Sequence, residues 1–237
     1  MEDFTQEGFS FAGYHTGEFE LILLERSAPS PAEKQITESV PFMQGIYDFS
    51  LILGERIYEN RPLSFKFTYF QDEYEKRKVD ETVLTNWLMR GGYQPLYDDH
   101  ARDYYYLAKC TLVQVEDDTA GRRLNINLSF DAYPFKLSAL PEGHGLWDNF
   151  NFDLDYSQDT EYTVNGSLSI NLMNVGSTGV TPIIIASAAM TIIKDGITYA
   201  IPAGETKSES FRLAIGENPM MVNGNGVIKF TFYKELI

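Results

Sequence analysis

Apolar and polar residues alternate along two stretches in the first half of the chain. Residues 61–70 (RPLSFKFTYF) and 122–132 (RRLNINLSFDA) place apolar side chains at every second position. A period of two puts those side chains on one face of a β-strand. Phe, Tyr and Trp make up 14% of the 237 residues, and aromatic residues favour strands. The sequence therefore predicts a mainly β protein.

The periodicity changes once, over residues 80–92 (DETVLTNWLMRGG). Four apolar residues there recur at the spacing of one helix face: Val83, Leu84, Trp87 and Leu88. We expect Gly91 and Gly92 to end this helix in a left-handed conformation. The charged residues 71–81 before it are typical of a solvated connector. One α-helix is therefore predicted, packed on the sheet of the first domain.

Prolines and glycines gather in the middle of the chain, which indicates a domain boundary. The residues concerned lie between positions 134 and 145: Pro134, Pro141, Gly143 and Gly145. We expect an N-terminal domain over residues 1–136 and a C-terminal domain over residues 137–237. The second domain reads as short strands separated by turns, such as the one at Asp195 and Gly196, and this pattern predicts a β-sandwich.

The charge of the chain excludes several classes of function. The formal net charge is −15, from 34 acidic and 19 basic residues. Such a surface repels phosphate, so a stable complex with nucleic acid is not expected. No apolar run approaches the ~20 residues that a membrane span needs. Residues 1–9 lack the basic start and apolar stretch of a signal peptide, so we expect a soluble protein made in the cytoplasm.

A search for catalytic or metal-binding groups returns little. Asp98, Asp99 and His100 form a short acidic turn with no second cluster to support a metal site. Asp153 and Asp155 alternate with apolar residues, which predicts the exposed face of a strand. The single cysteine, Cys110, lies in the middle of a predicted strand and reads as a small core residue. The sequence predicts no enzyme, no metal and no cofactor.

Residues 39–56 (SVPFMQGIYDFSLILGER) form an unusual apolar stretch. Pro41, Phe42 and Met43 are followed by Gln44 and Gly45, and a strand-like run begins at Tyr47. This segment is either a core strand entered through a tight turn or an apolar lip that contacts a partner. The residues alone leave both interpretations open.

Six motifs resemble, in one order, a known family. They are FSFAGYHTGEFELILLE (9–25), SVPFMQGIYDFS (39–50), TVLTNWLMRGGYQPLYDD (82–99), LNINLSFDAYPF (124–135), INLMNVGSTGVTPIIIA (170–186) and GENPMMVNGNGVIKFTFYKELI (216–237). Together they are similar to the distal tail proteins of long, non-contractile-tailed phages of Gram-positive bacteria. There are two departures: Ala12 stands where the family has Asn, and residues 41–45 interrupt its Pro-Gly pair.

The resemblance implies a structural protein of the virion tail tip, made in the host cytoplasm. Its N-terminal part would be a β-sandwich-like belt domain that closes a homo-hexameric ring, and its C-terminal part a galectin-like β-sandwich. The ring would join the tail-tube protein to tail-tip or receptor-binding proteins and leave a channel for DNA. Single and double rings stay open. The candidate residues for the subunit interface are Pro41, Phe42, Met43, Gln44 and Tyr47.

A ring that passes DNA is expected to have an acidic or neutral inner wall, because a basic wall would bind the DNA. Two acidic runs are candidates for this lumen: Asp72, Glu73 and Glu75, and Glu116, Asp117 and Asp118. The alternative is that both runs are outer loops kept soluble by their charge.

Two other functions remain open. A galectin-like sandwich can bind sugar, but galectin-type sites gather His, Asn, Arg and Trp on one sheet face. In this chain the available groups are Arg212, with His144 and Trp147 near the domain boundary. A tail-tube subunit is the other alternative, and it predicts polymerisation into tubes instead of closed rings.

Overall fold

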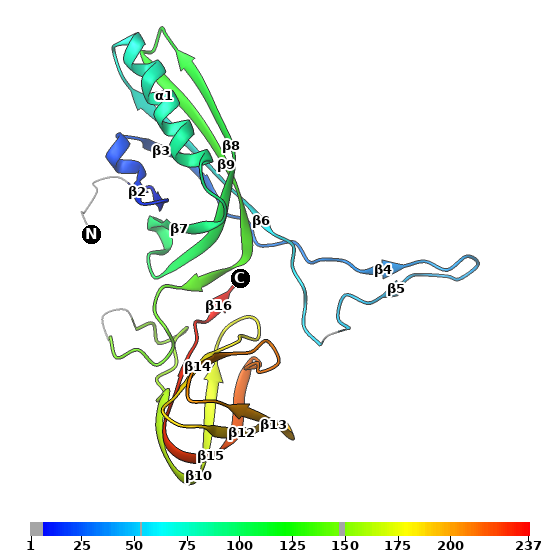
Figure 1. Cartoon of the computed structure of the whole chain (residues 1–237). Helices are drawn as coiled ribbons and strands as arrows, with labels where there is room; N and C mark the ends of the chain where they lie inside the picture. Colours follow the sequence, from blue (N-terminus) through cyan, green and yellow to red (C-terminus); the bar gives the residue numbers. More distant parts are fainter. Residues whose placement is uncertain (1–6, 53, 147–149) are drawn as a thin grey trace. The chain divides into compact units, whose positions relative to one another are not determined.

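A computed structural model describes residues 7–52, 54–146 and 150–237 of the chain. The chain divides into two compact units, residues 1–136 with Ile237, and residues 137–236. Both units are built from strands, and the described residues contain one α-helix, α1 (Tyr74–Met89) (Figure 1). The predicted mainly β fold with one helix is therefore confirmed.

The first unit contains one large antiparallel sheet. Its strand order is β2-β1-β7-β8-β9-β6-β3. The strands are β1 (Phe9–Phe11), β2 (Tyr14–His15), β3 (Ile22–Ser27), β6 (Arg61–Phe70), β7 (Gln94–Asp98), β8 (Tyr104–Asp118) and β9 (Arg123–Ser138). Two short 3-10 helices, η1 (Thr16–Phe19) and η2 (Asp99–Ala101), follow β2 and β7. A separate two-stranded ribbon is formed by β4 (Thr37–Glu38) and β5 (Tyr47–Asp48).

The alternating apolar residues of β6 and β9 form the floor of the first core. Phe65 pairs with Leu128 and Phe67 with Ile126, so their side chains share one buried face. Phe9 of β1 packs on Phe65 with ring centroids 4.7 Å apart, although three strands separate β1 from β6 in the sheet. The sheet therefore curls until one end lies over the other, which gives a two-layered, sandwich-like core.

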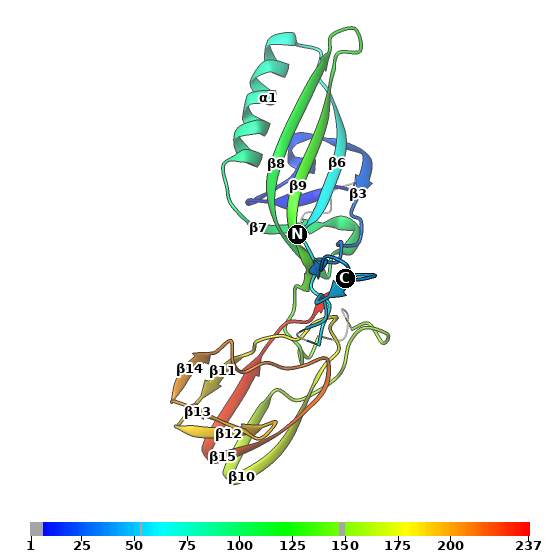
Figure 2. The same cartoon turned by 90° about the vertical axis from the view of Figure 1, so that its right-hand side faces the viewer.

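Helix α1 covers part of this core and runs alongside β8 (Figure 2). Leu84, Trp87 and Leu88 are buried. The Trp87 Nε1–H donates to the Phe11 carbonyl at 2.9 Å, and its ring stacks on Phe19. Val83 was expected on the same face but is 45% exposed. It lies next to the helix face formed by residues 84, 87 and 88, which packs on the sheet, and is not part of that face.

The helix is longer than the apolar pattern predicted. It begins at Tyr74, so the expected charged connector at residues 71–81 is wrong. The first half of the helix exposes charged side chains and buries Arg77, a residue that a hydrophobic pattern does not register. The helix ends at Met89 with Arg90 in a right-handed conformation, so the expected left-handed Gly91–Gly92 end is also wrong.

The second unit is built around one long strand pair. The strands β10 (Glu161–Asn174) and β15 (Gly216–Thr231) pair along fourteen residues each. On the other edge of β15, β12 (Met190–Lys194) pairs with its first half and β11 (Ile183–Ala186) with its second half. The outermost strands are β13 (Ile197–Ile201) beside β12 and β14 (Gly204–Lys207) beside β11. The short β16 (Glu235–Leu236) pairs with β9.

Two glycines that lie opposite each other allow this long strand pair to bend. Gly166 of β10 lies opposite Gly224 of β15, and their φ angles are +82° and +145°. A Cβ on Gly224 would lie 2.8 Å from Met190 Cγ, so a larger residue does not fit. Residues from both halves of the pair, such as Leu172 and Ile228, enter one core cluster. The two halves therefore form the two layers around a single core.

The strand expected around Asp153 and Asp155 does not exist. Residues 150–156 form turns, in which the Leu154 and Asp155 N–H groups donate to the Asn151 carbonyl. The Asn151 and Asp155 side chains accept further backbone N–H groups there. Such local bonds compete with a strand ladder, which is why alternation alone misled the prediction.

We predict that Trp87→Ala lowers the free energy of unfolding by about 3–5 kcal/mol, because a buried ring is lost and the Phe11 carbonyl loses its donor. Val83→Ala on the exposed face of α1 is the matched control and should change stability by less than about 0.5 kcal/mol. Urea unfolding followed by circular dichroism measures both. Equal effects of the two substitutions would contradict the assigned helix face.

Candidate interaction surfaces

Residues 32–59 form an arm that extends away from the sheet of the first unit (Figure 1). Backbone hydrogen bonds join its two sides near the base, from Lys34 N–H to the Ile57 carbonyl and from Glu59 N–H to the Ala32 carbonyl. Farther out, β4 and β5 continue the ladder as a narrow ribbon. A two-stranded ribbon is at best marginally stable alone, so this arm is suited to packing on another surface.

The arm exposes a long series of apolar side chains. Phe42 at its tip is 109% exposed, as open as in an extended peptide. Tyr47 and Phe49 stack on each other with centroids 6.1 Å apart and are about half exposed. The large apolar side chains exposed along the arm are Ile36, Val40, Phe42, Ile46, Tyr47, Phe49, Leu51 and Ile52. Such a concentration is typical of an interaction surface.

This geometry excludes one of the two interpretations of residues 39–56. Among the described residues of this stretch, only Tyr47 and Asp48 form a strand and only Ser50 is fully buried, so the core-strand interpretation is wrong. Leu53, part of the expected run, lies outside the described residues. The candidate interface residues Pro41, Phe42, Gln44 and Tyr47 are exposed, and Met43 is half-buried. Their contact with another subunit remains a prediction.

The tip of the arm is a turn that holds Phe42 in an unfavourable conformation. Met43 N–H donates to the Val40 carbonyl at 3.1 Å, with Pro41 and Phe42 at the two central positions. Phe42 has a φ of +67°, where glycine is the usual residue. The other departure from the family pattern, Ala12, also has a positive φ, of +49°. In both places the chain carries a residue that its own backbone disfavours.

A buried arginine anchors the base of the arm. Arg61, the first residue of β6, is 4% exposed. Its guanidinium donates to the carbonyls of Ala28 and Pro134, both at 3.2 Å, and lies over the Tyr106 ring. These bonds connect the strand that follows the arm to the segment that precedes it. The arm therefore projects from a fixed base.

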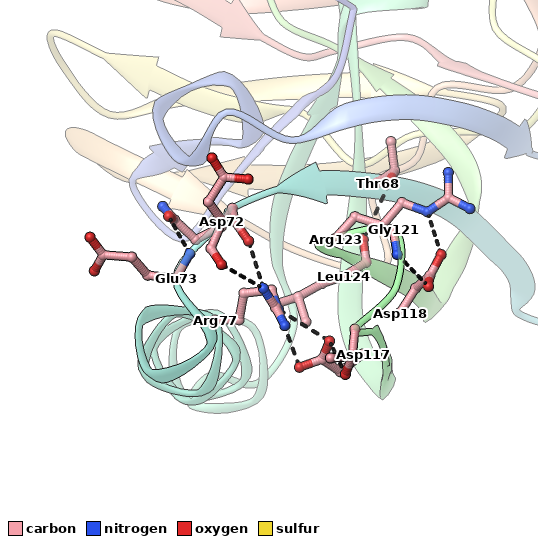
Figure 3. Close-up of polar contacts among 11 residues, drawn as sticks. Thr68, Asp72, Glu73, Arg77, Asp117, Asp118, Gly121, Arg123 and Leu124 are labelled. Atoms are coloured by element: carbon pink, nitrogen blue, oxygen red, sulfur yellow. Dashed lines mark hydrogen bonds and ion pairs between the residues drawn. The ribbon is translucent and has the colours of Figure 1, made fainter.

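Residues of the two acidic runs proposed for the lumen lie close together, since Asp72 and Glu73 lie near Asp117 and Asp118 (Figure 3). The link between them is Arg77 of α1, which is 1% exposed. Its Nε–H donates to both carboxylate oxygens of Asp117, at 3.1 and 3.2 Å. Its Nη1 donates to the carbonyls of Gln71 and Asp72. Sequence reasoning missed Arg77, since nothing distinguishes it from its neighbours in the charged run EKRK.

Most of the candidate lumen carboxylates have a cationic partner. Asp72 pairs with Arg122, Glu75 with Lys78, and Asp118 with Arg123. The Gly121 N–H, together with Arg123, holds the pKa of Asp118 below its usual value. Glu116 accepts a hydrogen bond from Gln114. Glu73 is the N-cap residue of α1. This group of residues is thus much less acidic than its sequence suggests, and its place in a lumen remains a prediction.

The described residues hold no group of three or more His, Cys, Asp or Glu side chains placed to bind a metal ion. His15 and Asp99 serve the local fold, because His15 Nδ1 accepts the Gly17 N–H and Nε2 lies 3.0 Å from Asp99 Oδ2. Burial raises the pKa of the Cys110 thiol to about 11, so it is protonated at neutral pH. Within the described part of the chain, no helix is long and apolar enough to span a membrane.

The groups considered for sugar binding are not shown to share a face. His144 lines a cavity of about 360 Å³ with Phe150, Gln158 and Asp159. Arg212 instead donates to Thr178 and to the Gly179 carbonyl. Trp147 lies outside the described residues. A galectin-type constellation is therefore not assembled from the residues that the structure describes.

Comparison with solved structures identifies the fold. The chain is similar to the SPP1 Dit (gp 19.1) protein, described as a paradigm of the hub adsorption apparatus in phages that infect Gram-positive bacteria. The TM-score is 0.67 at 13% identity, and the match covers 96% of this chain and 98% of that one. The phage p2 baseplate in its activated conformation with strontium matches at a TM-score of 0.44 and 9% identity, over 97% of both chains. No protein-family model and no curated sequence matches. The expected resemblance to distal tail hub proteins is confirmed as a shared fold.

We predict that Arg77→Met lowers the free energy of unfolding by about 3–5 kcal/mol, because it leaves Asp117 and two backbone carbonyls without their donor. Arg122→Met, which removes an exposed pair with Asp72, should cost less than about 1 kcal/mol. Adding Asp117→Asn to Arg77→Met should recover part of the loss. If Arg77→Met proves as mild as Arg122→Met, Arg77 does not hold α1 to the β8–β9 hairpin.

Proposed function

We propose that this chain is a structural hub protein of a phage tail tip. Its likeness to the SPP1 Dit protein extends over nearly the whole of both chains and supports this function. The observation specific to this chain is the apolar arm, whose tip residue Phe42 has no cover within its own subunit. Exposed apolar surface of this extent is typical of a site that contacts another protein, which fits a subunit of an assembly.

In this proposal the first units close a homo-hexameric ring. A heterologous contact uses two unlike surfaces on each subunit, and repeating it closes a ring when the rotation allows. The arm supplies one of these surfaces, because Phe, Tyr and Met are enriched at the centres of interfaces. Each contact should bury at least about 800 Å² per partner, as specific interfaces do. Residues 32–59 are long enough to contribute most of this area.

The second unit serves as the galectin-like domain in this proposal. The ring would join the tail tube on one side to tail-tip or receptor-binding proteins on the other. The centre of the ring would leave a channel for DNA. With a charge of −15 per subunit, a hexamer carries 6 × −15 = −90 formally. This charge opposes tight binding of DNA during its passage, even where individual carboxylates are paired.

We expect the purified chain to form hexamers or dodecamers, as measured by light scattering and native mass spectrometry. Phe42→Gly should weaken assembly at least tenfold, because each contact loses an aromatic side chain whose burial contributes about 1.5–3 kcal/mol. The same change should leave the unfolding free energy of the subunit unchanged or higher, since glycine accepts a φ of +67° without strain.

Phe152→Gly is the matched control, because Phe152 is 84% exposed but lies in the second unit. It should leave the assembly unchanged. A wild-type chain that stays monomeric at tens of micromolar would refute the ring. Assembly that survives Phe42→Gly in full would move the subunit contact away from the tip of the arm.

We also predict that the assembled protein does not bind duplex DNA at micromolar concentration, even at about 50 mM salt, where charge-driven binding is strongest. A gel-shift titration checks this outcome. Retarded DNA at micromolar protein would contradict a channel through which DNA passes freely.

A further inference from the structure

Three ionisable side chains meet in the interior of the second unit. Lys234 lies between β15 and β16, Asp155 in the turn that follows Asn151, and Glu142 in the loop after β9. Their side chains are 2%, 9% and 5% exposed, respectively. Neither the fold comparison nor the proposed hub function gives this group a role.

The contacts place the amine of Lys234 against the carboxyl of Asp155. Lys234 Nζ forms an ion pair with Asp155 Oδ1 and donates to the Leu154 carbonyl at 3.1 Å. Glu142 Oε1 lies 3.8 Å from the same Nζ. The other oxygen of Asp155, Oδ2, accepts the Asn151 N–H at 2.7 Å. Both oxygens of Asp155 thus have fixed and different surroundings.

The backbone around these side chains holds them in place. Glu142 N–H donates to the carbonyl of Phe232, a core residue two positions before Lys234. Ser138 N–H donates to the Lys234 carbonyl at 3.1 Å. Asp155 N–H is fixed to the Asn151 carbonyl at 2.8 Å. The amine and the carboxyl therefore approach each other from segments that are each bonded in place.

The balance of charge favours neutral forms of these groups. One amine faces two carboxyls, so full ionisation would leave a net negative charge in a site almost closed to water. Burial raises the pKa of Glu142, although Lys234 opposes that shift. When Glu142 is protonated, one proton is left for Lys234 and Asp155. The pair is then either an ion pair or a neutral amine beside a neutral acid. In a dry site the neutral amine and neutral acid are much closer in energy to the ion pair than in water.

We propose that Lys234 and Asp155 condense to form an amide cross-link within the second unit, with Glu142 transferring the proton. The neutral Nζ attacks Cγ of the protonated Asp155 carboxyl, and a C–N bond forms. The negative charge that develops on Oδ2 is stabilised by the Asn151 N–H, which already points at this oxygen.

Breakdown of this intermediate completes the reaction. Glu142 accepts a proton from the nitrogen and delivers one to Oδ1, which leaves as water when the C–O bond breaks. Glu142 ends in its starting state, and no oxidant, metal or cofactor is needed. The products are one amide and one water molecule.

Holding the reacting groups in contact supplies the driving force that a free amine and acid lack in water. Positioned groups react with very large effective concentrations, and burial removes the ionisation that protects carboxylates from attack. The cross-link would close a covalent loop from residue 155 to residue 234. It would fix the turn after Asn151 to the C-terminal end of the second unit.

Intact mass spectrometry of the purified full chain tests the proposal. The expected mass is about 18 Da below the sum of the residues, because one water is lost. Trypsin should then fail to cut after Lys234, and residues 137–194 should be recovered joined to residues 230–237. A wild-type chain with the full mass and free peptides would overturn the proposal and leave a buried ion cluster only.

Substitutions separate the roles of the three side chains. Lys234→Met should keep its full calculated mass, and Glu142→Gln should do so or condense far more slowly. Asp155→Asn can still condense, losing about 17 Da as ammonia, and should reach the same final mass as the wild type. Circular dichroism checks that each variant folds. If a variant does not fold, the mass of the wild-type chain still shows whether the cross-link forms. A cross-link that forms equally fast in folded Glu142→Gln would remove Glu142 from the mechanism.

Discussion

The packing of Phe9 on Phe65 and Phe130 is the contact on which the first unit depends. These rings belong to β1, β6 and β9, and their centroids lie 4.7 and 5.4 Å from that of Phe9. A twisted sheet can bring its ends together only if large side chains fill the space between them. Trp87 closes this core from the helix side. The exposed apolar residues of the arm do not belong to this core cluster.

Buried basic side chains fix the positions of the chain segments around the two cores. Arg61 connects the flanks of the arm, Arg77 connects α1 to the β8–β9 hairpin, and Lys234 connects the C-terminal end to the loop after β9. Buried charged groups seldom add much net stability, but each accepts only a specific set of partners. In a chain of net charge −15, these three residues therefore specify which loops meet.

The tip of the arm carries a residue that lowers the stability of the chain while its side chain stays exposed. Phe42 costs roughly 1–2 kcal/mol in its left-handed conformation, and its ring makes up none of the core. A residue that is both strained and exposed supports the proposal that the tip of the arm contacts another molecule. The acidic residues proposed for the lumen differ from Phe42, because most of their carboxylates already have a cationic partner within the chain. These partners are Arg77, Lys78, Arg122 and Arg123.

Residue patterns along the chain were enough to predict the mainly β class, the helix around Trp87 and the likeness to distal tail proteins. Each follows from local periodicity or from the order of motifs, which needs no knowledge of distant contacts. The three-dimensional structure was needed to show that residues 74–79 are helical, that residues 150–156 are not a strand, and that the stretch at Phe42 is exposed. It also brought Glu142, Asp155 and Lys234 together. Residues 150–156 are held by local hydrogen bonds between Asn151 and Asp155, which apolar alternation does not register. The buried Arg77 and the group of Glu142, Asp155 and Lys234 depend instead on partners far apart in the chain, and local residue patterns do not show which distant groups will meet.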